Sequence, residues 1–101
     1  MDHPATQLSE LIHQKTRLGI MALLREASSA EFRLIASTLN LTAGNLSRHI
    51  AILENAGLVK TSKGYVGKRP RTWVAITHTG RTELAKEVKY LKKIIDSHPN
   101  E

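Results

Sequence analysis

The chain has 101 residues, of which 41% are hydrophobic and 24% charged, and this length holds one globular domain rather than a multi-domain enzyme. It has no cysteine, which excludes disulfides, thiolate metal sites and a thiol nucleophile. No apolar run approaches the roughly 18 residues that span a bilayer, and the first residues lack a signal-peptide pattern, so we expect one cytoplasmic domain over residues 1–101.

The formal net charge of +6 is concentrated in the middle of the chain. Residues 1–41 carry four basic and four acidic side chains, and residues 73–101 carry five basic and four acidic ones. Residues 42–72 carry six basic side chains against Glu54 alone, a net charge of +5. A basic stretch of this kind indicates a polyanionic partner.

The N-terminal part of the chain predicts two helices. Residues 7–13 form an amphipathic pattern with Leu8, Leu11 and Ile12 on one face. A second helical pattern runs from about Lys15 to Ala27, where apolar residues recur at intervals of three and four. Each helix has an apolar face that must be covered, either within the chain or by a second copy.

The next segment predicts a helix-turn-helix. Phe32 is expected in a very short strand, followed by a helix over roughly Arg33 to Leu39. Two short helices that cross near a right angle need a small residue where they touch, which Ala36 supplies. The turn needs a residue that tolerates positive φ, which Asn40 supplies. Apolar side chains occupy the flanking positions Ile35, Leu39, Leu41 and Leu46, although an ordinary helical pair can share part of this pattern.

The second helix of this pair is the best-marked element and is expected from Thr42 to Ala56. Thr42 is suited to cap it, because its hydroxyl can accept a hydrogen bond from an unpaired first-turn N–H. Gly57 follows at the position where a left-handed residue ends a helix. The inward stripe consists of Leu46, Ile50 and Leu53, and His49 is expected at the edge of the core.

The C-terminal part predicts a hairpin and a last helix. Residues Leu58–Ser62 and Thr72–Ile76 are rich in β-branched side chains and are expected as two strands, joined by a long loop over Lys63–Arg71. Thr77 is expected to cap a helix over about His78 to Ser97. Helix, helix-turn-helix and hairpin, in this order, predict a winged helix-turn-helix fold: mainly α, with a small β-hairpin wing (α+β).

Several stretches carry a resemblance to a known family. Leu41–Ile50, Leu53–Val59 and Gly67–Trp73 resemble the small prokaryotic winged-helix regulators of the ArsR/MarR type, and Ile76–Arg81 resembles the start of their final helix. The similarity covers roughly Leu8 to Leu91. It implies a dimeric transcription factor, usually a repressor relieved by a ligand or a modification, and therefore a protein associated with the nucleoid.

Short polar side chains at the start of the helix from Thr42 to Ala56 are expected to enter a major groove. Asn45 can pair with adenine and Arg48 with guanine, while Thr42 and Ser47 suit phosphate oxygens. Gly44 costs helix propensity, and either tight packing or close approach to DNA can explain it. The expected contact residues of this helix are Thr42, Ala43, Gly44, Asn45, Ser47 and Arg48.

The predicted wing supplies most of the remaining basic charge. Arg71 is the candidate for insertion into the minor groove, because Pro70 and Thr72 hold it near a strand end. Lys60 lies on a strand, where it either contacts DNA or is simply solvated. The expected wing contacts are Lys60, Lys63, Lys68, Arg69, Arg71 and Thr72.

The last helix carries a coiled-coil-like seam, with apolar residues at intervals of four, three and four. Such a seam on a terminal helix predicts a homodimer on a palindromic site, and packing against the N-terminal helix of the same chain is the alternative. The expected interface residues are Leu8, Leu11, Ile12, Leu84, Val88, Leu91 and Ile95.

Other classes of function are less well supported. No nucleophile is paired with a carboxylate orienter, so we expect no enzyme, no catalytic residue and no cofactor. Asp96 and His98 have ligand-like spacing, and His3 and His13 are further candidates. Pro99 breaks the helix there and the chain has no cysteine, so no metal is expected. A winged-helix protein-interaction module, or a non-specific nucleic-acid-binding protein, is the alternative. RNA would favour exposed aromatic side chains, for which Tyr65 is the one candidate.

Overall fold

A computed structural model describes residues 10–97 of the chain. Residues 10–13 are helical and lead into α2 (Lys15–Ala27). The side-chain oxygen of Gln14 caps α2 by accepting a hydrogen bond from the Arg17 N–H at 2.9 Å. Ser28, with a φ of 67°, ends the helix. Both N-terminal helices are thus confirmed over these residues, while Leu8 lies outside the described part of the chain.

The short strand precedes the position predicted for it. β1 (Ser29–Glu31) is antiparallel to the hairpin strand β3 (Arg69–Ile76), with Ala30 opposite Val74. Phe32 is already the first residue of α3 (Phe32–Thr38). The expectation of a strand at Phe32 was therefore wrong. The strand exists because of pairing with residues more than 40 positions away, which local sequence does not reveal.

The helix-turn-helix and the cap of its second helix are confirmed. Asn40 has a φ of 55°, as the turn requires, and α4 (Ala43–Asn55) follows. The Thr42 hydroxyl accepts a hydrogen bond from the Asn45 N–H at 3.1 Å. Gly57 has a φ of 78°, so the chain leaves α4 through a left-handed residue.

The hairpin is longer than the sequence predicts. β2 (Val59–Val66) and β3 (Arg69–Ile76) pair along their whole length and are joined only by Gly67 and Lys68. The predicted long loop over residues 63–71 was therefore wrong. Its glycines and Pro70 do not break the strands, because Pro70 lies on an edge of a two-stranded ribbon, where proline is tolerated.

The last helix, α5 (His78–Ser97), starts where predicted. The Thr77 hydroxyl accepts a hydrogen bond from the Gly80 N–H at 2.9 Å and donates one to the Gly57 carbonyl at 2.6 Å. Gly80 lies so close to the backbone of Leu58 that a Cβ added to Gly80 would be 2.1 Å from the Leu58 carbonyl oxygen. A glycine is needed at this position because the start of α5 presses against the backbone of Leu58, between α4 and β2.

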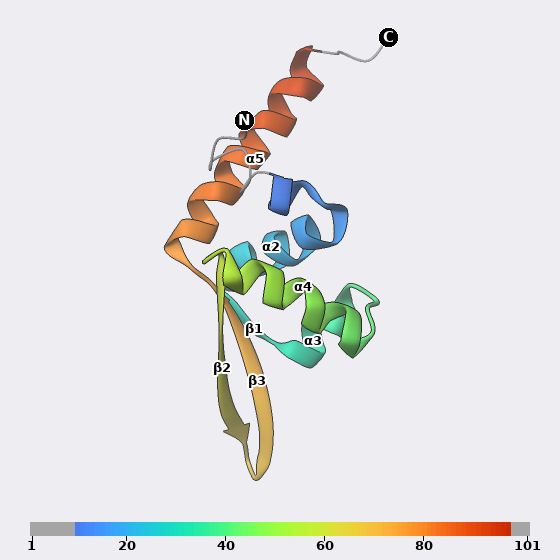
Figure 1. Ribbon diagram of the computed structural model, residues 1–101, viewed down its shortest axis with the longest axis vertical. Coiled ribbons are helices and arrows are strands. Elements are labelled where there is room, and N and C mark those ends of the chain that lie inside the picture. The colour runs from blue at the N-terminus through green and yellow to red at the C-terminus, as the bar shows by residue number, and fades with distance from the viewer. Residues whose placement is uncertain (1–9, 98–101) are drawn as a thin grey trace.

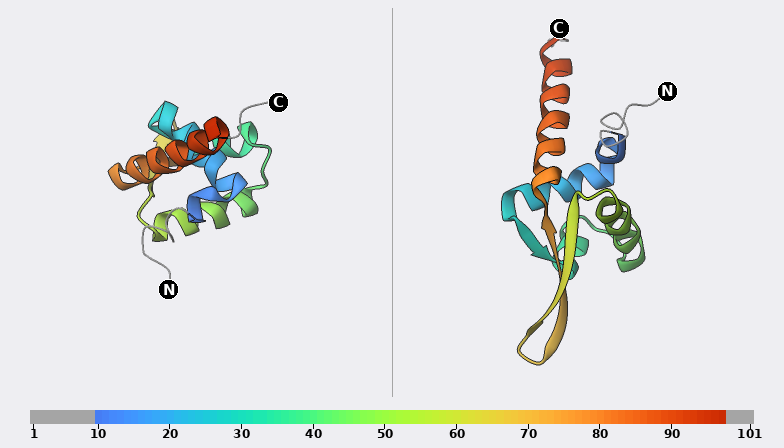
Figure 2. Two further views of the ribbon diagram at one scale, coloured as in Figure 1. Left: turned by 90° about the horizontal axis from the view of Figure 1, so that it is seen from above. Right: turned by 60° about the vertical axis from the view of Figure 1, so that its left-hand side comes forward.

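The sheet has the order β1-β3-β2, and the helices pack beside its base (Figure 1). The wing and the C-terminal half of α5 project at opposite ends of the 54 Å long axis (Figures 1 and 2). This arrangement is a winged helix-turn-helix of the α+β class, as predicted, with β1 as a third strand. The fully buried side chains are Ile12, Ile20, Met21, Leu24, Ile35, Leu46, Leu53, Leu58, Val59, Val74 and Leu84.

Candidate nucleic-acid interface

One side of α4 is buried and the other is open to solvent. Its inward side packs into the core through Leu46, Ile50 and Leu53. The outward side leaves all six predicted contact residues exposed: Thr42, Ala43, Gly44, Asn45, Ser47 and Arg48. The start of α4 therefore presents small and polar side chains and one guanidinium on a continuous surface.

Gly44 has no packing role in this surface. A Cβ added there would meet nothing within 4 Å, and the residue lies in ordinary helical backbone. Of the two explanations that the sequence left open, tight packing is therefore excluded within the protomer. The remaining explanation is that another molecule approaches the backbone of α4 at this point.

His49 lies behind the surface, as predicted, with an exposed fraction of 7%. Arg17 connects it to the N-terminal helix, because Nη1 donates to His49 Nδ1 at 3.4 Å and Nε donates to the Leu11 carbonyl at 2.6 Å. Burial, and then the positive charges of Arg17 and Arg48, lower the pKa of His49. The imidazole therefore tends to stay neutral and supports α4 from inside.

The wing is fixed to α4 by one carboxylate. Glu54 Oε2 accepts hydrogen bonds from both the backbone N–H and the hydroxyl of Thr61, each at 3.0 Å. Between α4 and the hairpin lies a groove of about 340 Å³, lined by Phe32, Ser47, Ile50, Ala51, Glu54, Thr61 and Thr72. The exposed side of α4 and one face of the wing thus border the same hollow, and Thr72 contributes to it as a half-buried residue.

The basic side chains predicted on the wing differ in their exposure and in their contacts. Lys60, Lys63, Lys68 and Arg69 are exposed. Arg71 is not free: its Nε lies 2.9 Å from Glu31 Oε1, and its side chain is only 15% exposed. The interpretation of Arg71 as a finger reaching into the minor groove is therefore corrected, because this guanidinium joins β3 to β1.

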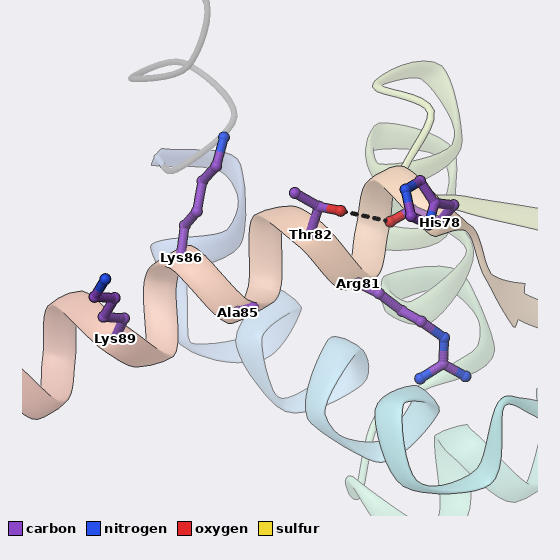
Figure 3. Close-up of a pocket in the computed structure, with 6 residues that line it drawn as sticks. All are labelled: His78, Arg81, Thr82, Ala85, Lys86 and Lys89. Carbon is purple, nitrogen blue, oxygen red and sulfur yellow. Dashed lines mark hydrogen bonds between the residues drawn. The ribbon is translucent and has the colours of Figure 1, made fainter.

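The exposed surface of α5 is more basic than its sequence indicates. Glu83 and Glu87 are 6% and 3% exposed, and they are covered rather than presented to solvent. Glu87 Oε2 is 2.5 Å from His13 Nδ1, while Glu83 Oε2 accepts from Lys86 Nζ at 3.0 Å. A surface groove of about 530 Å³ runs along the helix, lined by the six residues drawn in Figure 3: His78, Arg81, Thr82, Ala85, Lys86 and Lys89.

The predicted dimer seam is divided between core and surface. Ile12 and Leu84 are 0% and 1% exposed within the protomer, so they were wrongly assigned to a dimer contact. Val88 and Ile95 are 36% and 68% exposed, and Leu91 and Leu11 are half-buried. The apolar stripe left on α5 thus lies in its projecting C-terminal half.

Comparison with known proteins identifies the family. Residues 16–95 match the family model described as a winged helix DNA-binding domain. The chain belongs to this family. The match runs from the second residue of α2 through every following helix and strand to most of α5. This winged-helix protein is thus a DNA-binding regulator by family.

Individual relatives agree with that assignment. The winged-helix protein is 42% identical to a transcriptional regulator homologue from Pyrococcus horikoshii OT3, with 90% of each chain covered and a TM-score of 0.85. It is 34% identical to an uncharacterized protein from Methanocaldococcus jannaschii, over 90% of this chain and 96% of the relative. NadR, solved in complex with 4-hydroxyphenylacetate, shares the fold at 24% identity and a TM-score of 0.66, covering 93% of this chain and 71% of NadR.

Two further properties concern residues 10–97 as a whole. No helix in this range is long and apolar enough to cross a membrane. No group of three or more histidine and carboxylate side chains in this range is arranged to hold a metal ion. His98 and His3, which the sequence offered as candidates, lie outside the described residues.

Sequence reasoning missed two residues that shape this surface and gave a third, Tyr65, a different role. Glu31 is paired with Arg71, 40 positions further along the chain. Glu54 accepts a hydrogen bond from Thr61, 7 positions further along. Tyr65 is 74% exposed on the wing. The two acids could not be found from local pattern, because their roles depend on which strand lies beside them, whereas Tyr65 was noticed only as a candidate for RNA stacking.

Proposed function

We propose that this protein is a homodimeric, sequence-specific regulator of transcription, acting as a repressor, that places α4 in the major groove of double-stranded DNA. The wing would lie on the backbone or in the minor groove. The observation that carries the proposal is Gly44, a helical glycine on the exposed side of α4 with open space above it. A partner that needs close access to the backbone would account for its position.

The charges suit the same partner. Arg48, Lys63, Lys68 and Arg69 are exposed, and each can meet a phosphate or a base edge. If each subunit neutralises about four phosphates, log K against log salt should have a slope of roughly −7 for a dimer. Asn45 and Arg48 are the candidates for reading bases, and Thr42 and Ser47 for phosphate.

The dimer part of the proposal rests on α5. Val88, Leu91 and Ile95 keep the spacing of a coiled-coil seam in the projecting half of the helix. A two-fold arrangement would place two α4 helices about 34 Å apart, facing successive major grooves of a palindromic operator. Association with the nucleoid follows from the same DNA binding.

A small-molecule effector is also part of the proposal. NadR was solved in complex with 4-hydroxyphenylacetate, a carboxylate. On this chain the groove along α5 is lined by three basic side chains. Lys86 is paired with Glu83 and Arg81 donates to Ser28 Oγ at 2.9 Å, so Lys89 is the candidate to bind an anion. A rise in melting temperature with 4-hydroxyphenylacetate as the probe, abolished by Lys89→Ala, would support such a site, and no rise would remove this particular class of effector.

The decisive experiment is selection of bound duplexes from a random pool, carried out with the wild type and with Arg48→Ala. We expect a palindromic consensus for the wild type and weaker base preference at one position for the variant. Binding without any consensus would favour the alternative of a non-specific nucleic-acid-binding protein. No binding to duplex would favour a protein-interaction module.

A further inference from the structure

The two faces of the wing carry different side chains. Successive residues of a strand point to opposite faces, and directly opposed residues share a face. Lys63 is opposite Thr72, and Tyr65 is opposite Pro70. These four residues therefore lie on the same face as Thr61, the residue that Glu54 of α4 holds. We call this the helix-side face of the wing: Thr61, Lys63, Tyr65, Pro70 and Thr72.

Part of the other face is occupied by contacts within the protein, although Lys60, Val66 and Arg69 on it are exposed. Arg71 and Trp73 alternate with Thr72 and so lie on this face. Arg71 is paired with Glu31 at 2.9 Å, and the Trp73 ring lies 3.6 Å from where a Cβ of Gly64 would be. Arg71, which the sequence had indicated for the minor groove, therefore lies on the face opposite to the helix-side face.

Tyr65 has no comparable cover. It is 74% exposed, a higher fraction than any other large hydrophobic side chain among residues 10–97. Its cross-strand neighbour is Pro70, whose ring fixes the backbone opposite. An exposed aromatic ring with a phenol hydroxyl suits a partner that offers both apolar and polar surface.

We propose that Tyr65, with Lys63 beside it, is the part of the wing that enters the minor groove of the duplex, in place of Arg71. The inference rests on the proposed DNA binding. The ring would lie against the sugars of the groove wall, while Lys63, about 7 Å away along the strand, would meet a phosphate. The hollow between α4 and Thr72 would receive the backbone between the two grooves.

The test is a set of binding measurements on the consensus duplex obtained by selection. Tyr65→Ala should weaken binding about tenfold, because aromatic residues dominate such contacts. The slope of log K against log salt should not change, because no charge is removed, whereas Lys63→Ala should lower it by about one per subunit. Tyr65→Phe should bind like the wild type if the ring makes the contact.

Two controls separate this inference from the function on which it rests. Val66→Ala changes an exposed neighbour on the opposite face and should leave binding unchanged. On a duplex trimmed of the base pairs flanking the α4 sites, wild type and Tyr65→Ala should bind equally, because the wing then has no groove to enter. A defect that persists on the trimmed duplex, or wild-type affinity of Tyr65→Ala on the full one, would overturn the inference. Failure of the wild type to bind any duplex would instead overturn the proposed function.

Discussion

Glu31 and Arg71 join the strand that precedes the helix-turn-helix to β3, the central strand of the sheet, with Oε1 and Nε 2.9 Å apart. The two side chains are 23% and 15% exposed, so the pair is partly shielded from water. β1 leads directly into α3, and this contact therefore ties the wing to the first helix of the helix-turn-helix. The wing and α4 are held in one relative orientation by this pair and by Glu54 with Thr61.

The first prediction concerns this ion pair. Glu31→Gln leaves the half-buried guanidinium of Arg71 without its countercharge, and we expect a loss of about 1 kcal/mol in the free energy of unfolding. For a domain of this size that corresponds to a melting temperature lower by roughly 4–8 °C. Glu26→Gln, at an exposed position of α2, is the control and should have no effect. A double-mutant cycle with Arg71→Gln should show coupling between the two residues, and additivity would contradict the prediction.

Gly44→Ala should have opposite effects on stability and on binding. A Cβ there meets no atom within 4 Å, so alanine should stabilise α4 by up to about 1 kcal/mol. The same methyl group should weaken duplex binding about tenfold, because it occupies the space in which DNA would approach. Thermal unfolding and a binding titration check the two effects.

Gly19→Ala is the matched control for Gly44→Ala. It also replaces a helical glycine, and its Cβ would meet Leu39 only at an ordinary contact distance of 3.7 Å. It should raise stability and leave DNA binding unchanged. If Gly44→Ala binds DNA as well as the wild type does, the proposed approach of DNA to α4 is wrong.

His49 predicts a pH dependence of stability. Its pKa is lowered from 6.5, first by burial and then by Arg17 and Arg48. The unfolded chain therefore takes up this proton at a higher pH than the folded protein. The free energy of unfolding should be unaffected by this group above pH 6.5 and should fall as the pH drops below 6.5 toward the folded-state pKa.

Denaturant titrations between pH 5 and about 7.5 measure this dependence. His49→Gln should flatten the decline, whatever its effect on the absolute stability. Arg17→Gln removes one positive neighbour and should make the decline smaller. His78→Gln alters an exposed imidazole and should leave it unchanged. An equally steep decline in His49→Gln would show that other groups cause it.

Ile95→Glu tests the proposed dimer. Ile95 is 68% exposed on the projecting half of α5, so the change should leave the protomer folded but place charge in the seam. We expect a monomer by light scattering and a loss of the concentration dependence of the melting temperature. Tyr90→Glu, at a 57% exposed site on another side of the same helix, should remain dimeric. Leu84→Ala, by contrast, should mainly destabilise the core.

Features that depend on neighbouring residues were predictable from the sequence. The Thr42 cap, the left-handed Asn40 and Gly57, and the Thr77 cap of α5 are local signals, and each was confirmed. Features that depend on distant residues were not. β1 needs Val74 opposite it, and the outer half of the wing needs pairs such as Tyr65 with Pro70.

The same distinction between neighbouring and distant residues applies to the candidate site. The exposed side of α4 follows from helical periodicity around Leu46 and was placed correctly, and His49 was placed at the core edge for the same reason. Arg71 was misjudged because its partner Glu31 is 40 positions away. The dimer seam of α5 was predicted only in part, because periodicity identifies an apolar face without showing which protomer covers it. Leu84 of this face is buried in the core of its own chain.

The two-residue turn at Gly67 and Lys68 restricts how the wing can change in length. A strand advances about 3.3 Å per residue, and moving the pairing by one position exchanges the faces of every side chain beyond it. A single inserted residue would therefore send Lys63 and Tyr65 to the side of Arg71. The wing can be lengthened while its helix-side face is kept only by adding two residues to each strand, in steps of about 7 Å. Insertions and deletions tolerated in this hairpin should accordingly come in even numbers.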